Sequence, residues 1–194
     1  MAQTSLVLTA VIPIFLIIVL GYGARRMHLF TEAAETALMR VITQLLYPCL
    51  ILSFVIGNPA LQQIDGVWLP PLIGFSTTVI GYIIGLIVFR WLCTGSKKDR
   101  RTFAFCTGLP NYGYFPIPIV AQLFDHETMG ILLVHNIGVE VALWSVGVGC
   151  LMANRPAKGL LLRIVNPPII ALIIGLMINF SGLAPQIPPY CMET

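Results

Sequence analysis

Residues 108–118 read Gly-Leu-Pro-Asn-Tyr-Gly-Tyr-Phe-Pro-Ile-Pro and lie inside a long apolar stretch, residues 103–124. This segment places three prolines and two glycines within eleven residues. A proline inside a helix removes a backbone hydrogen bond and clashes with the preceding turn. We therefore expect two half-helices that meet at an unwound centre. The alternative is a single structural helix with a kink.

The composition around this segment is typical of a membrane protein. Of the 194 residues, 57% are hydrophobic and only 10% are charged, against about 25% charged residues in soluble domains. The net charge of +3 is too small to indicate a nucleic-acid partner. The five cysteines form no CxxC pair and have no histidine at zinc-ligand spacing. We therefore expect a lipid bilayer as the surroundings, and no catalytic residue, metal ligand or cofactor.

Six apolar stretches are long enough to cross a bilayer, which takes about 20 residues. They are residues 6–24, 37–56, 67–92, 103–124, 129–153 and 164–183. The expected fold is all-α: a polytopic helical membrane protein of six transmembrane helices, with the fourth broken mid-membrane.

The basic residues predict the orientation of these helices. All eleven lie in or beside the first, third and fifth loops, whereas loops 57–66 and 125–128 carry only acidic charges. Cytoplasmic loops collect lysine and arginine. We expect an integral protein of the plasma (inner) membrane, with its N-terminus outside and its Lys/Arg-rich loops cytoplasmic. The eleven are Arg25, Arg26, Arg40, Arg90, Lys97, Lys98, Arg100, Arg101, Arg155, Lys158 and Arg163.

The break in the fourth stretch predicts a substrate site. A half-helix N-terminus inside the membrane offers free N–H groups and a partial positive charge to a carboxylate, as in several secondary carriers. Side chains of the fifth stretch reach a similar depth at 1.5 Å per helical residue. The expected substrate-binding residues are Pro110, Asn111, Tyr112, Gly113, Pro118 and Asn136.

Two ionisable residues stand out in the fifth stretch. Glu140 shares a helix face with Asn136, four residues earlier, and lies close to the bilayer centre. An ionisable residue at that depth is costly unless it is paired or hydrated, so a functional role is the default hypothesis. Glu140 is a candidate for proton coupling and His135 for a relay. The alternative is that both serve helix packing, which for His135 is the favoured interpretation.

The order of short motifs along about 110 residues resembles that of the auxin efflux carrier family of membrane transport proteins. In the fourth stretch, Leu109-Pro110-Asn111 and Ile117-Pro118 are similar to the broken-helix motif of that family. Pro116 departs from it, because glycine is expected there. The earlier matching residues are Thr9-Ala10, Pro13, Leu20, Tyr22-Gly23, Phe30-Thr31, Arg40, Pro48-Cys49-Leu50, Phe54 and Asn58-Pro59.

The resemblance implies a fold of ten helices in two inverted five-helix repeats, in which two broken helices cross at the substrate site. It also implies export of organic anions, indole-3-acetate in plants and dicarboxylates of the malate or malonate type in bacteria. Pro110 and Asn111 would take the crossover positions, and Pro118 would close the motif.

Six spans correspond to one half of such a carrier and one further helix. We expect residues 1–153 to form the first repeat, 154–163 a cytoplasmic linker, and 164–194 the first helix of a second, incomplete repeat with its outer tail. Pro167 precedes Gly175 by the same eight residues that separate Pro13 from Gly21. The chain would then be a fragment of a longer carrier, which we favour, or would assemble as a homodimer.

The sequence therefore predicts a secondary transporter of a small organic anion, coupled to protons or sodium or driven by the membrane potential alone. The alternatives are a membrane scaffold or half-carrier that transports nothing, and an intramembrane enzyme that uses His135 and Glu140. The enzyme is disfavoured because the sequence contains neither HExxH nor GxSxG.

Overall fold

The computed structural model describes residues 2–62, 67–113, 115–151 and 166–183, and within them it contains helices and no strands. This confirms the all-α prediction. The predicted linker, residues 154–163, lies outside the described residues. The elements are α1 (Ala2–Arg26), α2 (Glu32–Val41), η1 (Ile42–Leu46), α3 (Tyr47–Val55), η2 (Pro59–Leu61), α5 (Leu69–Leu92), α6 (Lys97–Gly108), α7 (Pro116–Leu123), α8 (His126–Ala142), η3 (Leu143–Gly147), α9 (Val148–Leu151) and α11 (Pro167–Phe180).

Four continuous helical segments are long and apolar enough to span a membrane: Leu8–Arg26, Glu32–Val55, Leu69–Leu92 and His126–Gly147. They match the first, second, third and fifth predicted spans. The fourth is split into α6 and α7, as expected from its prolines. The sixth, α11, has 14 described residues, about 21 Å of helix.

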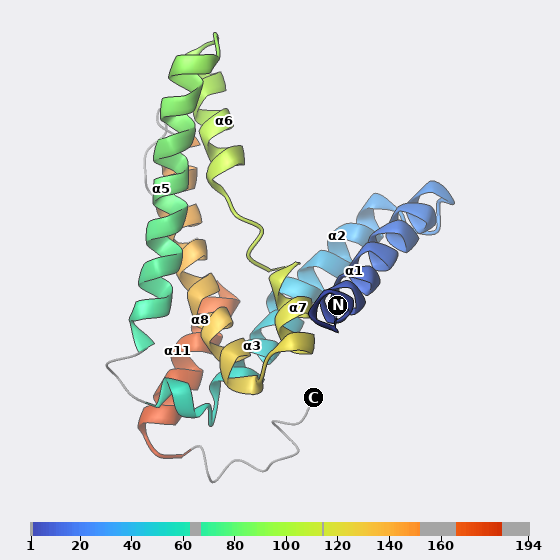
Figure 1. Cartoon of the computed structure of the whole chain (residues 1–194), viewed down its shortest axis with the longest axis vertical. Helices are drawn as coiled ribbons and strands as arrows, with labels where there is room; N and C mark the ends of the chain where they lie inside the picture. Colours follow the sequence, from blue (N-terminus) through green and yellow to red (C-terminus); the bar gives the residue numbers. More distant parts are fainter. Residues whose placement is uncertain (1, 63–66, 114, 152–165, 184–194) are drawn as a thin grey trace.

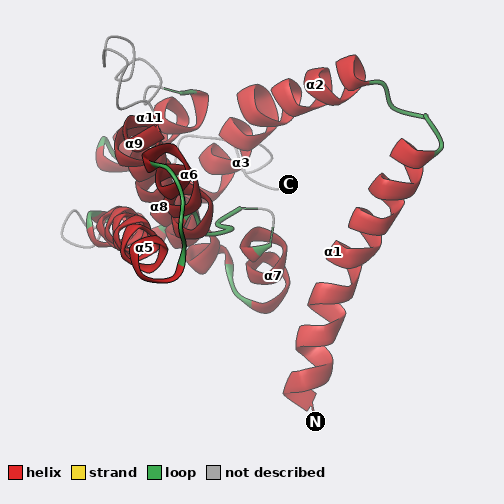
Figure 2. Cartoon of the chain, turned by 90° about the horizontal axis from the view of Figure 1, so that it is seen from above, coloured by secondary structure: helices red, strands yellow, loops and turns green. Residues whose placement is uncertain are grey.

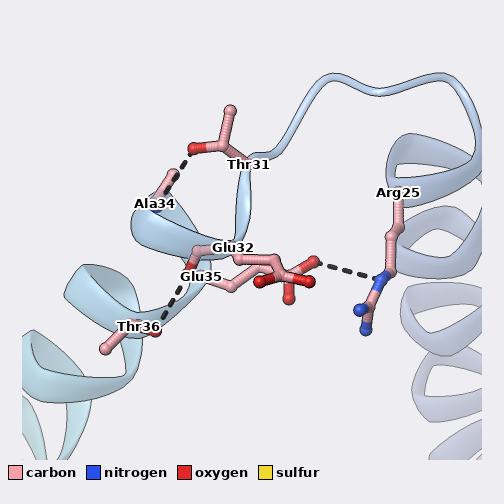
Figure 3. Close-up of polar contacts among 6 residues, drawn as sticks. All are labelled: Arg25, Thr31, Glu32, Ala34, Glu35 and Thr36. Atoms are coloured by element: carbon pink, nitrogen blue, oxygen red, sulfur yellow. Dashed lines mark hydrogen bonds and ion pairs between the residues drawn. The ribbon is translucent and has the colours of Figure 1, made fainter.

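Helices α2, α6 and α8 begin several residues before the corresponding predicted spans, because polar caps extend them. Thr31 accepts a hydrogen bond from the Ala34 N–H, so α2 starts at Glu32. The Ser96 side chain and Asp99 form a reciprocal capping box that starts α6 at Lys97. Asp125 caps α8, and the hydrogen bonds from Thr128 lower the pKa of its carboxyl group. Near the Thr31 cap, Arg25 pairs with Glu35 across the α1–α2 turn (Figure 3).

Two π-helical turns interrupt the long helices. In the second span, η1 directly precedes Pro48, whose ring would clash with a carbonyl in the turn before it. A wider turn relieves that conflict without ending the helix. In the fifth span, η3 lies beyond Glu140.

Most of the helices pack together in one group, and α1 extends away from it. Helices α5, α6 and α8 lie side by side, and α11 packs along α3 (Figure 1). Helix α1 stands apart from this group and contacts mainly α7 (Figure 2). Most large hydrophobic side chains of α1 are exposed. In a bilayer these side chains face acyl chains, where apolar exposure carries no penalty.

Glycines bring α5 within backbone contact of its neighbours. A Cβ on Gly138 of α8 would collide with the backbone oxygen of Pro71, and one on Gly74 with that of His135. A Cβ on Gly81 would lie 2.9 Å from the Gly108 oxygen, at the end of α6. Such small-residue contacts drive helix association in membranes, where the hydrophobic effect between helices is absent.

Asparagine side chains join the helix ends. Asn179 of α11 donates to the Val55 carbonyl at 2.6 Å and accepts from the Gly57 N–H at 2.7 Å, so it satisfies the open end of α3. Asn58 is fully buried and donates to the carbonyls of Phe54 and Glu127, which ties α3 to the start of α8. These bonds hold α3, α8 and α11 around one apolar cluster.

The glycine contacts predict a position-dependent cost of adding one methyl group. Gly138→Ala should destabilise the folded protein by about 1–3 kcal/mol, because the Pro71 backbone cannot move out of the way. Gly21→Ala is the matched control, since nothing lies within 4 Å of the position that its added methyl group would take. Thermal unfolding in detergent micelles should show a lower midpoint for Gly138→Ala alone. Equal midpoints would contradict the close α5–α8 approach.

Candidate functional site

The unwound segment between α6 and α7 is the centre of the candidate site. Helix α6 ends at Gly108, and Leu109 is already extended, with φ −85° and ψ 110°. Helix structure resumes at Pro116, after Phe115. The connecting segment runs from the α5–α6 pair across to α7, which contacts α1 and α8 (Figure 1). One predicted span is thereby divided between two groups of helices.

The start of α7 offers fewer free amides than an ordinary helix N-terminus. Pro116 and Pro118 occupy its first and third positions, and proline has no N–H. The N–H between them, that of Ile117, donates to the Gly113 carbonyl at 3.1 Å. Hydrogen-bond donors for an anion must therefore come from the unwound segment between α6 and α7 and from side chains nearby.

The predicted residues in and beside the unwound segment are exposed or half-buried. Asn111 and Pro110 are exposed, and the Asn111 side chain makes no hydrogen bond to a described residue. Tyr112 is half-buried and has an interaction partner. A Cβ on Gly113 would meet nothing within 4 Å, so there is open space beside it. Pro118 is half-buried within the first turn of α7.

Asn136 is the unusual polar residue of α8. It is fully buried, and its Nδ2 has no hydrogen-bond partner among the described residues. Its Oδ1 lies 3.4 Å from the His135 Nδ1. An unsatisfied buried donor costs about 1–3 kcal/mol. Such a group inside a membrane protein is expected where a water or a solute completes its hydrogen bonding.

Glu140 has a partner that sequence reasoning missed. Its Oε2 accepts a hydrogen bond from the Asn166 Nδ2 at 2.6 Å, and Asn166 also caps α11 by accepting from the Ile169 N–H. Asn-Pro-Pro before an apolar run is a recognisable helix start, but nothing in it points to Glu140. The carboxylate thus links the fifth span to the sixth.

The structure shows no hydrogen bond between His135 and Glu140, the two residues of the proposed proton relay. His135 is half-buried, its ring contacts Asn136 rather than Glu140, and its backbone oxygen abuts Gly74 of α5. Within residues 2–62, 67–113, 115–151 and 166–183, no group of three or more His, Cys, Asp or Glu side chains is arranged to hold a metal ion.

Comparisons with known proteins agree with this architecture. The family model described as membrane transport protein matches residues 6–162. The chain is also similar to an uncharacterized transporter of Methanothermobacter thermautotrophicus, at 23% identity over 180 residues. That alignment covers 89% of this chain, and the chain spans 57% of the length of that relative. No solved structure matches the chain.

The Glu140–Asn166 bond predicts a specific stability defect. Asn166→Ser keeps a capping side chain for α11 but is too short to reach Glu140, so it should cost about 1–3 kcal/mol. Glu140→Gln is the matched variant, because its amide oxygen still accepts the bond, and it should cost less. Thermal unfolding in micelles measures both. A neutral Asn166→Ser would show that the bond contributes nothing to stability.

Proposed function

The chain belongs to the membrane transport protein family, and from that premise we propose that it acts as a secondary transporter of a small organic anion. The solute binds where the fourth span is unwound, between α6 and α7. Auxin-like monocarboxylates and short dicarboxylates are the solute classes that suit the site. A single observation carries the proposal: the backbone of this span is opened by three prolines. In a bilayer, open backbone is tolerated beside protein or a water-filled cavity.

Neutral donors provide the binding contacts. Between Arg101 and Arg155 the sequence contains no lysine or arginine, so no fixed cation of this region pairs with a carboxylate. The exposed Asn111 amide and the unsatisfied Asn136 Nδ2 supply N–H donors. Amides release an anion more readily than a buried cation does, because the site carries no charge to be left unpaired.

The arrangement of the helices supports movement of one half of the broken span relative to the other. Helix α6 is held on α5 through glycine contacts, whereas α7 packs mainly against α1, where Phe15 and Phe115 meet edge to face at 6.2 Å, and to a lesser extent against α8. Displacement of α6 relative to α7 would change the geometry of the segment that connects them. Glu140 is our candidate for coupling such movement to protons, with uniport driven by membrane potential as the alternative.

We propose that the protein resides in the plasma membrane with its basic loops in the cytoplasm. Flux in proteoliposomes loaded with radiolabelled indole-3-acetate or malonate tests the transport proposal. A membrane enzyme would release product without flux, and a scaffold would do neither.

Asn111→Ala should lower the rate of uptake about tenfold or more, because it removes a hydrogen bond to a charged solute. Membrane insertion and thermal stability should stay unchanged, since the side chain is exposed and bonds to no described residue. Gln122→Ala, at another exposed polar position near the end of α7, is the control. Uptake kinetics identical to the unaltered protein would remove Asn111 from the site.

Asn136→Leu should act on stability and transport in opposite directions. Replacing the unsatisfied amide by an apolar side chain of similar size should raise the free energy of unfolding by about 1–2 kcal/mol and abolish uptake. Parallel measurement of thermal midpoints and flux separates the two effects. A lower midpoint would assign Asn136 a structural role instead.

A further inference from the structure

The turn between α5 and α6 carries a concentration of positive charge. Five basic residues lie within residues 90–101, against one acidic residue, Asp99. We call these five the basic tip: Arg90, Lys97, Lys98, Arg100 and Arg101. The pair of helices occupies one end of the molecule, at the top of Figure 1. Positive charge on this turn is thus well separated from the candidate transport site.

Asp99 keeps its negative charge within the helix cap, so the five basic residues and this one acidic residue leave the basic tip with a net charge of +4. Its Oδ2 accepts hydrogen bonds from the Ser96 N–H at 2.9 Å and the Ser96 hydroxyl at 2.8 Å. The carboxylate is therefore occupied in the helix cap. At 100° per residue, the four basic residues of α6 span an arc of about 160° and Asp99 faces away from them. One side of the first turn of α6 is consequently uniformly positive.

Arg100 contains an unsatisfied donor within this surface. It lies one turn before Ala104, which packs against Gly85 of α5, so its side chain runs along the α5–α6 contact. Its Nε is buried and has no hydrogen-bond partner in the described part of the chain. The Arg100 side chain as a whole is only partly buried, and a guanidinium beside other cations favours a phosphate oxygen as its acceptor.

The end of α5 adds an apolar component at the same end of the α5–α6 pair. Trp91 and Leu92 are each 80% exposed, and a shallow, open hollow is lined by Arg90 and Trp91. Helix α5 is long and apolar enough to span the membrane, so these side chains lie near the level of the lipid headgroups. Exposed tryptophan at this level is typical of a membrane interface. The combination of phosphate-binding cations and an interfacial aromatic residue indicates a lipid and not a soluble polyanion.

We propose that the basic tip binds the headgroup of an anionic phospholipid, with its phosphate between the α6 lysines and Arg100 and its glycerol end beside Trp91. Phe89 and Phe103, whose ring centroids are 5.5 Å apart, hold the two helix ends together and pre-form this surface. A bound lipid braces the α6 half of the broken span at the membrane surface. The proposal stands independently of the transported solute.

The first basic pair of the chain offers an internal comparison. Arg25 is already paired with Glu35, at 3.5 Å between Nε and Oε1, so its charge is partly neutralised within the protein (Figure 3). Substituting Arg25 and Arg26 removes the same two positive charges as substituting Lys97 and Lys98. The two double variants therefore have equal net charge but differ in where the charge is lost.

Fluorescence of Trp91 in nanodiscs measures the proposed binding directly. With Trp68→Phe and Trp144→Phe as the background, Trp91 is the reporter, and brominated phosphatidylglycerol is added in steps to a phosphatidylcholine bilayer. We expect quenching well above that of brominated phosphatidylcholine at the same mole fraction. Lys97→Gln with Lys98→Gln should weaken the apparent affinity about 30-fold, whereas Arg25→Gln with Arg26→Gln should leave it nearly unchanged.

Three further measurements test whether the binding depends on charge and on the intact lipid. Lys97→Arg with Lys98→Arg should retain the affinity, and 1 M NaCl should abolish the preference for phosphatidylglycerol in the unsubstituted background. Inorganic phosphate at constant ionic strength should not displace the lipid. Equal quenching by the two brominated lipids, an unaltered affinity in the glutamine variant, or displacement by phosphate alone would each overturn the proposal.

Discussion

A membrane-spanning backbone has to satisfy its own hydrogen bonds, and the fourth span of this protein cannot do so. Prolines at 110, 116 and 118 remove donors and prevent a continuous helix, so the chain passes from α6 to α7 through an unwound segment. The surrounding helices are arranged around that interruption. Glycine contacts fix α6 on α5, and α5 on α8, while α7 packs against α1.

Asparagine is the residue that connects the helices at their ends. Asn58, Asn166 and Asn179 each use both the donor and the acceptor of their amide: Asn58 and Asn166 satisfy groups on two different elements, and Asn179 satisfies two groups at the end of α3. Apolar side chains cannot fix one helix on another in this way in lipid, because acyl chains are as apolar as leucine. Asn136 differs from these three, since its Nδ2 is buried and has no partner in the described part of the chain. That difference is the basis of the binding role proposed for Asn136.

Much of the architecture was predictable because it depends on local chemistry. Long apolar runs identify the spans, and the spacing of prolines in residues 108–118 predicts the break. The earlier starts of α2, α6 and α8 were also encoded locally, in Thr31, Ser96 and Asp125. Hydropathy alone places these boundaries too late, because the capped first turns are polar. The scarcity of free amides at α7 follows from the prolines at 116 and 118, whose rings carry no N–H.

The sequence by itself determined the helical class, the positions of the spans and the interruption of the fourth, because each depends on residues near one another in the chain. Only the tertiary structure decided that Glu140 binds Asn166, that Asn136 lacks a partner for its Nδ2 among the described residues, and that Arg100 holds an unsatisfied Nε beside α5. These facts depend on which helix faces lie together. Helix packing in membranes is decided by close contacts of small residues such as Gly74 and Gly138, and a periodicity of apolar residues does not specify them.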